Sequence, residues 1–169
     1  MITNIVCHTD LQCSINLKDL TSKCVNIIYD PSRFPAAIWK HKTIGGTCMV
    51  FSNGKLMVNG KIKSIREARQ RVRRYARLLQ KIGCHITLKR IVISTISAFY
   101  KLDGPLDVYR LAQHYGGSYE FERFPATMFI KDTIHFTCFH TGAVLMTGIK
   151  TERTFYDTII PTLLEMYLL

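Results

Sequence analysis

A four-residue sequence, Arg-Phe-Pro-Ala, occurs twice in this chain, at Arg33–Ala36 and at Arg123–Ala126. A second phenylalanine follows each copy, Phe51 in the first case and Phe139 in the second, and each directly precedes a turn sequence. The two copies lie 90 residues apart, and the two later phenylalanines lie 88 residues apart. A nearly constant offset predicts two homologous repeats, so that a functional residue in one half has a counterpart in the other.

Both repeats, residues 1–88 and 89–169, show the same predicted order of elements. In the first, alternating apolar residues predict strands at residues 5–9, 25–29, 36–41, 47–51 and 55–59, with helices at 16–23 and 64–82. In the second, strands are expected at residues 90–97, 118–121, 126–130, 134–139 and 143–147, with helices at about 105–115 and from 151 onward. No flexible linker separates the repeats, so we expect an α+β fold with one sheet and helices on one of its faces.

Local signals mark the ends of the predicted helices. Asn16 is an N-cap residue, and Ser64 with Glu67 forms a capping box at the start of the longest helix. Gly83 is expected to end that helix. Its inner face is traced by apolar residues at helical spacing, namely Ile65, Ala68, Val72, Tyr75, Ala76 and Leu79. In the last helix Phe155, Ile159, Leu163 and Tyr167 recur at a spacing of four, and Pro161 should bend or locally open it.

Composition favours a polyanionic partner. The chain carries 23 Lys and Arg against 12 Asp and Glu, a formal charge of +11, which points first to nucleic acid and second to an anionic membrane surface. No apolar run reaches the ~18 residues that span a bilayer, and no signal sequence opens the chain. We therefore expect an intracellular protein without a membrane partner.

Six cysteines are scattered without a Cys-x-x-Cys pair or a nearby histidine at metal-ligand spacing. They are typical of reduced structural thiols. No pairing of nucleophile and base and no phosphate-binding loop is present either. The sequence therefore predicts neither an enzyme nor a metal or cofactor site.

The outer face of the longest helix is basic, with Arg66, Arg69, Arg71, Arg73, Arg74 and Lys81. A charged helix face is often only solvated, but this excess of cations also suits an acidic partner.

The face of the sheet opposite the helices is a second candidate surface. Several residues expected there are more apolar than water contact requires, namely Val6, Met49, Met57, Val58 and Leu145, which indicates a binding surface.

The four phenylalanines Phe34, Phe51, Phe124 and Phe139 would ordinarily be assigned to a core. Their positions argue otherwise, because each lies beside a proline or a hairpin turn, where burial is difficult. Two aromatic residues are thus expected at the strand ends of each repeat.

These residues resemble the TATA-box-binding protein family over nearly the whole chain. The resemblance rests on Thr3–Val6, Asn16–Lys18, Asp30–Phe34, Phe51–Lys55, Tyr75–Gly83 and Ser118–Glu120, together with the duplicated phenylalanine pairs. It implies a saddle-shaped, pseudo-twofold fold with a curved antiparallel sheet of about ten strands and two helices per half on the convex face. The residues do not separate a TATA-box-binding protein from a related factor.

The resemblance also implies site residues for binding in the DNA minor groove. Phe34, Phe51, Phe124 and Phe139 would wedge between base pairs, and apolar contacts would come from Val6, Met49, Met57, Leu145, Pro35 and Pro125. Hydrogen bonds to base edges would come from Asn4, Asn59, Thr95 and Thr147, where an Asn and a Thr are exchanged relative to the family pattern. Phosphate contacts would come from Arg33, Lys40, Lys55, Arg123 and Lys150. In the second repeat, Ile130 and Ala143 stand where the first repeat has Lys40 and Lys55. The second hairpin is two residues shorter than the first, so its phenylalanines are expected to enter the DNA at a different angle.

The partners implied are promoter DNA, TFIIB-like and TFIIA-like general transcription factors, and RNA polymerase machinery indirectly. The acidic pair Glu120 and Glu122 would meet the TFIIB-like factor, unless it is only solvated, and Arg66, Arg69 and Arg73 would meet other regulators. Weak self-association through the concave face and a nuclear location are further expectations. The expected function is a transcription initiation factor that binds and kinks A·T-rich DNA; the alternative is a scaffold of the same family with weak or altered DNA binding.

Overall fold

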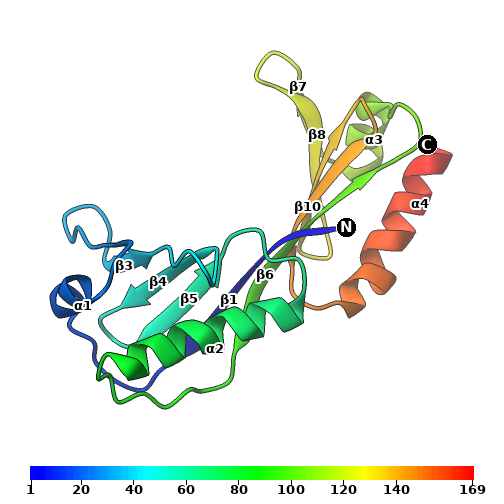
Figure 1. Cartoon of the computed structure of the whole chain (residues 1–169). Helices are drawn as coiled ribbons and strands as arrows, with labels where there is room; N and C mark the ends of the chain where they lie inside the picture. The colour runs from blue at the N-terminus through cyan, green and yellow to red at the C-terminus, as the bar shows by residue number, and fades with distance from the viewer. The chain divides into compact units, whose positions relative to one another are not determined.

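The computed structural model describes all residues, 1–169, and contains ten antiparallel strands and four α-helices (Figure 1). Two compact units are present: Asn4–Ser94, the first unit, and Thr95–Leu169 together with Met1–Thr3, the second unit. Neighbouring strands follow the order β2-β3-β4-β5-β1 in the first unit and β7-β8-β9-β10-β6 in the second. The predicted α+β class, with ten antiparallel strands and two helices per half, is confirmed.

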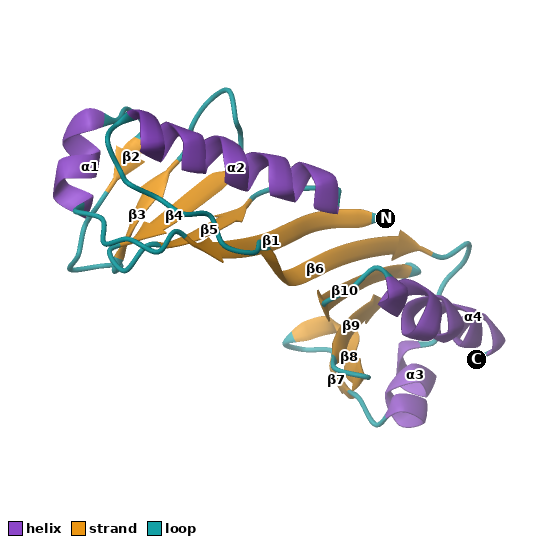
Figure 2. Cartoon of the chain, turned by 90° about the horizontal axis from the view of Figure 1, so that it is seen from below, coloured by secondary structure: helices purple, strands orange, loops and turns teal.

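The first unit contains β1 (Ile2–Asp10), α1 (Leu17–Lys23), β2 (Ile27–Ile28), β3 (Ala36–Trp39), β4 (Thr47–Phe51), β5 (Lys55–Asn59) and α2 (Ile65–Lys81). The second contains β6 (Val92–Lys101), α3 (Val108–Tyr115), β7 (Ser118–Glu120), β8 (Phe124–Lys131), β9 (Ile134–Phe139), β10 (Ala143–Ile149), a π-helical turn (Phe155–Ile159) and α4 (Ile160–Leu168). In each unit the helices lie on one side of the strands (Figure 2).

Most predicted boundaries agree with the structure, and the largest shift is in β6. We expected this strand at residues 90–97, but it runs from Val92 to Lys101. The residues before it instead pack against the end of β1: Thr87 N–H donates to Leu11 O, and Lys89 N–H donates to Asp10 O. The alternation of apolar residues in the sequence does not show that these backbone N–H groups form hydrogen bonds with β1.

The caps of α1 and α2 form largely as predicted. The Asn16 side chain accepts a hydrogen bond from Asp19 N–H, and Ser64 Oγ accepts one from Glu67 N–H. The capping box is not reciprocal, because the Glu67 carboxylate accepts from Lys63 N–H instead of from Ser64 N–H. Gly83 follows the helix with a φ of 100°, which favours glycine at this position.

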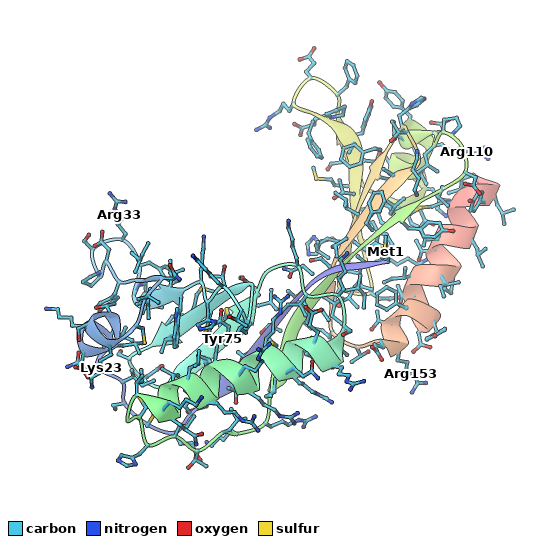
Figure 3. All side chains as sticks on the ribbon, in the orientation of Figure 1. Met1, Lys23, Arg33, Tyr75, Arg110 and Arg153 are labelled. Atoms are coloured by element: carbon cyan, nitrogen blue, oxygen red, sulfur yellow. The ribbon has the colours of Figure 1, made fainter.

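The first unit is held together by the apolar face of α2 against the helix-covered side of the strands. Ala68, Val72, Tyr75 and Leu79 are all fully buried, as the helical spacing predicts. The Tyr75 side chain points from α2 toward the sheet (Figure 3), where its ring contacts Trp39 at a centroid distance of 5.4 Å. Its hydroxyl accepts from His41 N–H at 3.2 Å and donates to Gly45 O at 3.3 Å, which satisfies a buried polar group.

The last helix opens locally, as the proline predicts. Before Pro161 the chain makes a π-helical turn, in which Ile160 N–H donates to Phe155 O five residues back. This turn inserts one extra residue into the helix. In the regular helix that follows, the buried stripe continues from Ile159 and Leu163 to Met166, whereas Tyr167, which the spacing of four placed on the same face, is half exposed.

An ion and aromatic cluster joins α3, α4 and β8 in the second unit. The Glu165 carboxylate accepts hydrogen bonds from His114 Nε2 at 2.9 Å, Tyr115 Oη at 2.8 Å and Lys131 Nζ at 3.0 Å. The Tyr115 ring stacks on Phe129 at 4.1 Å, and Phe129 stacks on the fully buried Phe136 at 4.9 Å. The Glu165 carboxylate therefore holds the Tyr115 ring in a stack with one ring from β8 and one from β9.

This cluster predicts a loss of stability in acid. Hydrogen bonds from His114, Tyr115 and Lys131 lower the pKa of Glu165 from 4.5 to about 2. A carboxyl whose pKa is lower in the folded state stabilises the fold above its unfolded value and loses that contribution as the pH falls toward the folded value. We expect Glu165→Gln to be less stable than the wild type at neutral pH, and the difference to shrink between pH 4.5 and about 2.

Urea denaturation at a series of pH values measures this difference. Glu122→Gln is the matched control, because Glu122 is an exposed carboxylate whose removal should leave the stability unchanged throughout the series. A difference between Glu165→Gln and the wild type that stays constant down to pH 2 would contradict the assignment.

Candidate nucleic-acid interface

In the first unit, the side of the strands opposite the helices carries a row of partly exposed apolar residues, here called the open face. Met57 lies opposite His8 on one side and opposite Met49 on the other, and Met49 lies opposite Ile38. These side chains alternate with buried ones along each strand, as a sheet covered on one face requires. Val6 has the same partial exposure in β1.

Val58 was expected on this face, and the expectation was wrong. Val58 is fully buried on the helix-covered side, where it lies opposite Cys7 and Cys48. Successive side chains of a strand point to opposite faces, so Met57 and Val58 cannot share one. Met57 is the open-face residue of the two.

The second unit has an equivalent row. Leu145 is exposed and lies opposite Phe99 and Thr137, and Thr137 lies opposite Met128. Offsets of 88–91 residues relate these four residues to Met57, His8, Met49 and Ile38 of the first unit. The repeat seen in the sequence is thus also a repeat of cross-strand neighbours.

The four phenylalanines form two similar ring pairs at the strand ends. Phe34 and Phe51 have centroids 6.2 Å apart at an interplanar angle of 61°, and Phe124 and Phe139 have centroids 5.6 Å apart at 71°. Both arrangements are edge-to-face contacts. Phe34 is 38% exposed and Phe124 is 41% exposed, so one ring of each pair is available for contact with a ligand. Pro35 and Pro125, which follow them, are also exposed.

The turns that carry these pairs are built alike. In the β2–β3 turn, Phe34 N–H donates to Asp30 O, and the Arg33 guanidinium lies 3.4 Å from the Asp30 carboxylate. In the β7–β8 turn, Arg123 N–H donates to Glu120 O, and its guanidinium lies 3.1 Å from the Glu120 carboxylate. Each arginine is highly exposed and projects from its turn, as Figure 3 shows for Arg33.

The shorter second hairpin keeps the strand register beside the ring pair. Ala36 lies opposite Phe51, and Ala126 lies opposite Phe139, so the register beside the rings is the same in both units. The two missing residues are lost at the other end, where residues 40–46 join β3 to β4 but only residues 132–133 join β8 to β9. The interplanar angle is 71° in the second pair against 61° in the first, and a different wedge angle against DNA stays a prediction.

The predicted hydrogen-bonding residues occupy open-face positions of their strands. Asn59 lies opposite Thr47, and Thr147 lies opposite His135 beside a bulge in β10. The Asn4 side-chain oxygen accepts from Gly60 N–H at 3.1 Å and Ile62 N–H at 3.4 Å. This leaves its amide group as the free donor. Thr95 is partly exposed in β6.

The predicted phosphate contacts are unequally supplied. Arg33, Lys40 and Lys55 are exposed in the first unit, and Arg123 and Lys150 are exposed in the second. Ile130, the counterpart of Lys40, is a 61% exposed apolar residue, and Ala143 takes the place of Lys55. The first unit therefore supplies three of these cations and the second unit two.

Several open-face residues were missed in the sequence, namely His8, Ile38, Thr47, Phe99, Met128, His135 and Thr137. The signal was available for those that lie an even number of positions from a predicted residue in the same strand, such as His8, Thr47 and Phe99. Ile38, in contrast, is identified because it lies opposite Met49, and this register between β3 and β4 is not visible in the sequence.

The buried thiols fit no catalytic role. Burial raises the pKa of Cys7 to about 11 and that of Cys138 to about 12, so both remain protonated at neutral pH. No group of three potential metal ligands occurs, and none of the helices is long and apolar enough to cross a bilayer.

Comparison with known proteins agrees with the resemblance in the sequence. Residues 1–82 match the family model described as transcription factor TFIID, or TATA-binding protein. The chain is 33% identical over 177 residues to the TATA-box-binding protein of Candida albicans, covering 97% of this chain and 71% of that protein. It is 31% identical over 172 residues to TATA-box-binding protein 1 of Triticum aestivum, covering 98% and 73%. This chain belongs to the TATA-binding protein family.

Members of the TATA-binding protein family are DNA-binding transcription factors and not enzymes. The fold is shared with the TATA-binding protein of Methanococcus jannaschii, with a TM-score of 0.86 at 24% identity, covering 99% of this chain and 98% of that one. The TATA box-binding protein-like 2 of Rattus norvegicus is also 30% identical, so the comparisons do not separate the two branches of the family.

In this TATA-binding protein family member, some charged residues of the candidate partner surfaces are exposed, whereas others are held in ion pairs. Arg66, Arg69 and Arg73 are exposed on α2. Arg71, which we also expected on that face, instead donates to Gly60 O at 2.8 Å and pairs with Glu67 at 2.6 Å. Glu120 is paired with Arg123, as described above, whereas Glu122 is exposed next to it.

The hydrogen bonds of Asn4 predict separate effects of two substitutions. Asn4→Ala removes the acceptor for two backbone N–H groups and should lower the free energy of unfolding by about 1–2 kcal/mol. Asn4→Asp keeps the acceptor oxygen and should be close to the wild type in stability. Urea denaturation measures both, with Asn59→Ala, which removes no hydrogen bond within the protein, as the control. Equal stability of Asn4→Ala and Asn4→Asp would disprove the role of the oxygen.

Proposed function

We propose that this protein is a transcription initiation factor that binds A·T-rich promoter DNA in the minor groove and kinks it. The proposal rests chiefly on the duplicated phenylalanine pair, Phe34 with Phe51 and Phe124 with Phe139. Each pair lies at the strand ends of an apolar open face and leaves one ring partly exposed. Aromatic wedges that unstack base steps, next to apolar surface that covers the widened groove, are a known means of minor-groove binding.

Membership of the family supports the choice of ligand. In this proposal, residues 1–88 and 89–169 are the two repeats, and each supplies one wedge pair. Unstacking a base step costs a few kcal/mol, which the contact of the apolar residues with the opened groove offsets. These contacts come from Val6, Met49, Met57, Leu145, Pro35 and Pro125. Because TA steps unstack most easily, the deformability of the DNA provides much of the selectivity.

The remaining selectivity comes from hydrogen bonds to base edges. The minor groove presents mainly adenine N3 and thymine O2, which are acceptors. The amides of Asn4 and Asn59 and the hydroxyls of Thr95 and Thr147 can all donate to them. The first repeat thus offers two amides and the second two hydroxyls, so we expect unequal preferences for the two halves of a site.

The polar surfaces away from the open faces are assigned to protein partners. The exposed carboxylate of Glu122, with Glu120, is proposed to meet a TFIIB-like general transcription factor. The exposed arginines of α2, Arg66, Arg69 and Arg73, are proposed to meet TFIIA-like or other regulatory partners. Through these factors the protein would reach the RNA polymerase machinery, and its place would be the nucleus.

Removing one wedge from each repeat tests the proposal. Phe34→Ala combined with Phe124→Ala should abolish the bending of a duplex that contains a TATA sequence, because the base steps are no longer opened. Energy transfer between fluorophores at the two duplex ends measures the bend. The control is Phe121→Ala, which removes an exposed ring that belongs to neither pair. A bend that is unchanged in the double variant would refute the wedge assignment.

The unequal supply of cations favours a second candidate function, a scaffold of the same family that binds DNA weakly and serves mainly to assemble other factors. Gel-shift titrations of a TATA duplex and a scrambled duplex at several salt concentrations separate the two. An initiation factor should prefer the TATA duplex at every salt concentration, whereas equal affinities would favour the scaffold.

The same titrations test the phosphate contacts. Lys55→Ala should lower the slope of log affinity against log salt by about one unit, and Ala143→Lys should raise it by about one unit. Lys18→Ala, on the exposed side of α1, is the control that should leave the slope unchanged. If Lys55→Ala and Lys18→Ala give the same slope, Lys55 does not contact a phosphate.

A further inference from the structure

The outer side of the C-terminal helical segment carries an uninterrupted apolar stripe. Tyr156, Ile160, Leu164 and Leu168, here called the outer stripe, recur at a spacing of four. They are 73%, 43%, 60% and 84% exposed. The opposite side of the same segment is already buried against the second unit, through Ile159, Leu163 and Met166. A helix that is apolar on both sides is expected to be covered on both.

The duplicated fold provides an internal control. In the first repeat, α2 occupies the equivalent place, and its outer side carries Arg66, Arg69, Arg73, Arg74 and Arg77. The fold therefore requires an apolar inner face of this helix but no apolar outer face. Single exposed apolar residues are common in soluble proteins, but a contiguous patch of them marks an interaction site.

A groove extends the outer stripe toward the strands of the second unit. It has a volume of about 370 Å³, and its walls include Met1, Tyr100, Phe155, Ile160, Leu164 and Tyr167. The Tyr167 hydroxyl accepts a hydrogen bond from Asp103 N–H at 3.1 Å, which fixes one wall. The patch thus has a ridge and an adjoining hollow, the shape into which side chains of another helix can pack.

The charged side chains along this segment have partners within the protein. Arg153 is 85% exposed at the start of the segment (Figure 3), where its guanidinium pairs with the Asp157 carboxylate at 3.0 Å. Arg110 lies at the other end, where it donates to Leu169 O. Glu165, the acid within α4, is turned toward His114, Tyr115 and Lys131. The charged side chains of the segment are thus paired within the protein, and apolar contact is what the outer stripe offers a partner. The charge of +11 on the whole chain favours a partner that is acidic outside its apolar face.

We propose that the outer stripe and its groove bind an amphipathic α-helix of another protein, with apolar residues at positions i, i+3 or i+4, and i+7 and with acidic flanking residues. From Tyr156 to Leu168 the stripe is ~18 Å long, which matches a partner helix of three to four turns. The i+4 rows of two helices pack into each other in the commonest helix-packing geometry. The proposal is independent of DNA binding.

A second copy of this chain is a less suitable occupant. The formal charge of +11 on each copy opposes self-association at moderate salt. The outer stripe exposes on the order of 500 Å² of apolar surface. A stable dimer needs about 800 Å² per partner. A short helix needs less contact area than a globular subunit.

The test uses a designed peptide and the full chain. The probe is a fluorescein-labelled, 18-residue helical peptide with leucines at i, i+3, i+4 and i+7 and glutamates at both ends. A peptide of the same composition in scrambled order is its control. We expect saturable binding of the first peptide, with shifts of the α4 amide signals in NMR spectra, and at least tenfold weaker binding of the scrambled one. Equal binding of the two peptides, or no change at α4 at millimolar peptide, would overturn the proposal.

Substitutions locate the site on the protein. Leu164→Glu should weaken binding of the peptide at least tenfold and leave TATA-duplex binding unchanged. Tyr156→Glu provides a second variant at a more exposed position. The matched control is Val25→Glu, which places the same charge at an exposed apolar residue of the first unit. Undiminished binding by both stripe variants would contradict the assignment, as would a dimer in sedimentation velocity that Leu164→Glu dissociates.

Discussion

The two-sided character of the strands is the constraint on which the rest of the structure depends. In each unit one face of the sheet is buried by helices, and the alternation of side chains then fixes which residues remain on the other face. On that face Met49, Met57 and Leu145 are apolar although they are not covered. Because the helices cover only one face of the strands, these apolar residues stay accessible on the other face.

Duplication lets each repeat serve as a control for the other. The register beside the rings is the same in both, and the ring pairs and the Arg33 and Arg123 ion pairs in the turns are similar, which is expected if both ends of a bound duplex are contacted in the same way. The helices diverge. The outer side of α2 is basic, whereas the outer stripe from Tyr156 to Leu168 is apolar, so equivalent places in the two units present different surfaces. A repeat can diverge in this way because surface residues are not constrained by the core.

Much of the fold could be predicted from the sequence because its signals are local. The Asn16 and Ser64 caps, the strands at 47–51, 55–59 and 134–139, and the opening of the last helix near Pro161 all depend on residues close in the chain. The errors arose where contacts between residues far apart in the chain determine the structure. Val58 was assigned to the wrong face, and Arg71 was placed among free cations although it binds Gly60 O. The start of β6 was placed two residues too early, directly after a segment in which Thr87 and Lys89 pair with the end of β1.

The sequence by itself determined the duplication, the family and the positions of the four phenylalanines, because an offset of 88–90 residues and a repeated motif are visible without coordinates. Only the tertiary structure decided that the rings pair edge to face, that the shorter hairpin is shortened away from them, and that Leu145, Phe99, Thr137 and Met128 share one row. Strand register arises from contacts between residues far apart in the chain, and a shift of one residue would move every side chain to the other face. The apolar outer side of the last helix likewise became recognisable only when its inner side was seen to be buried.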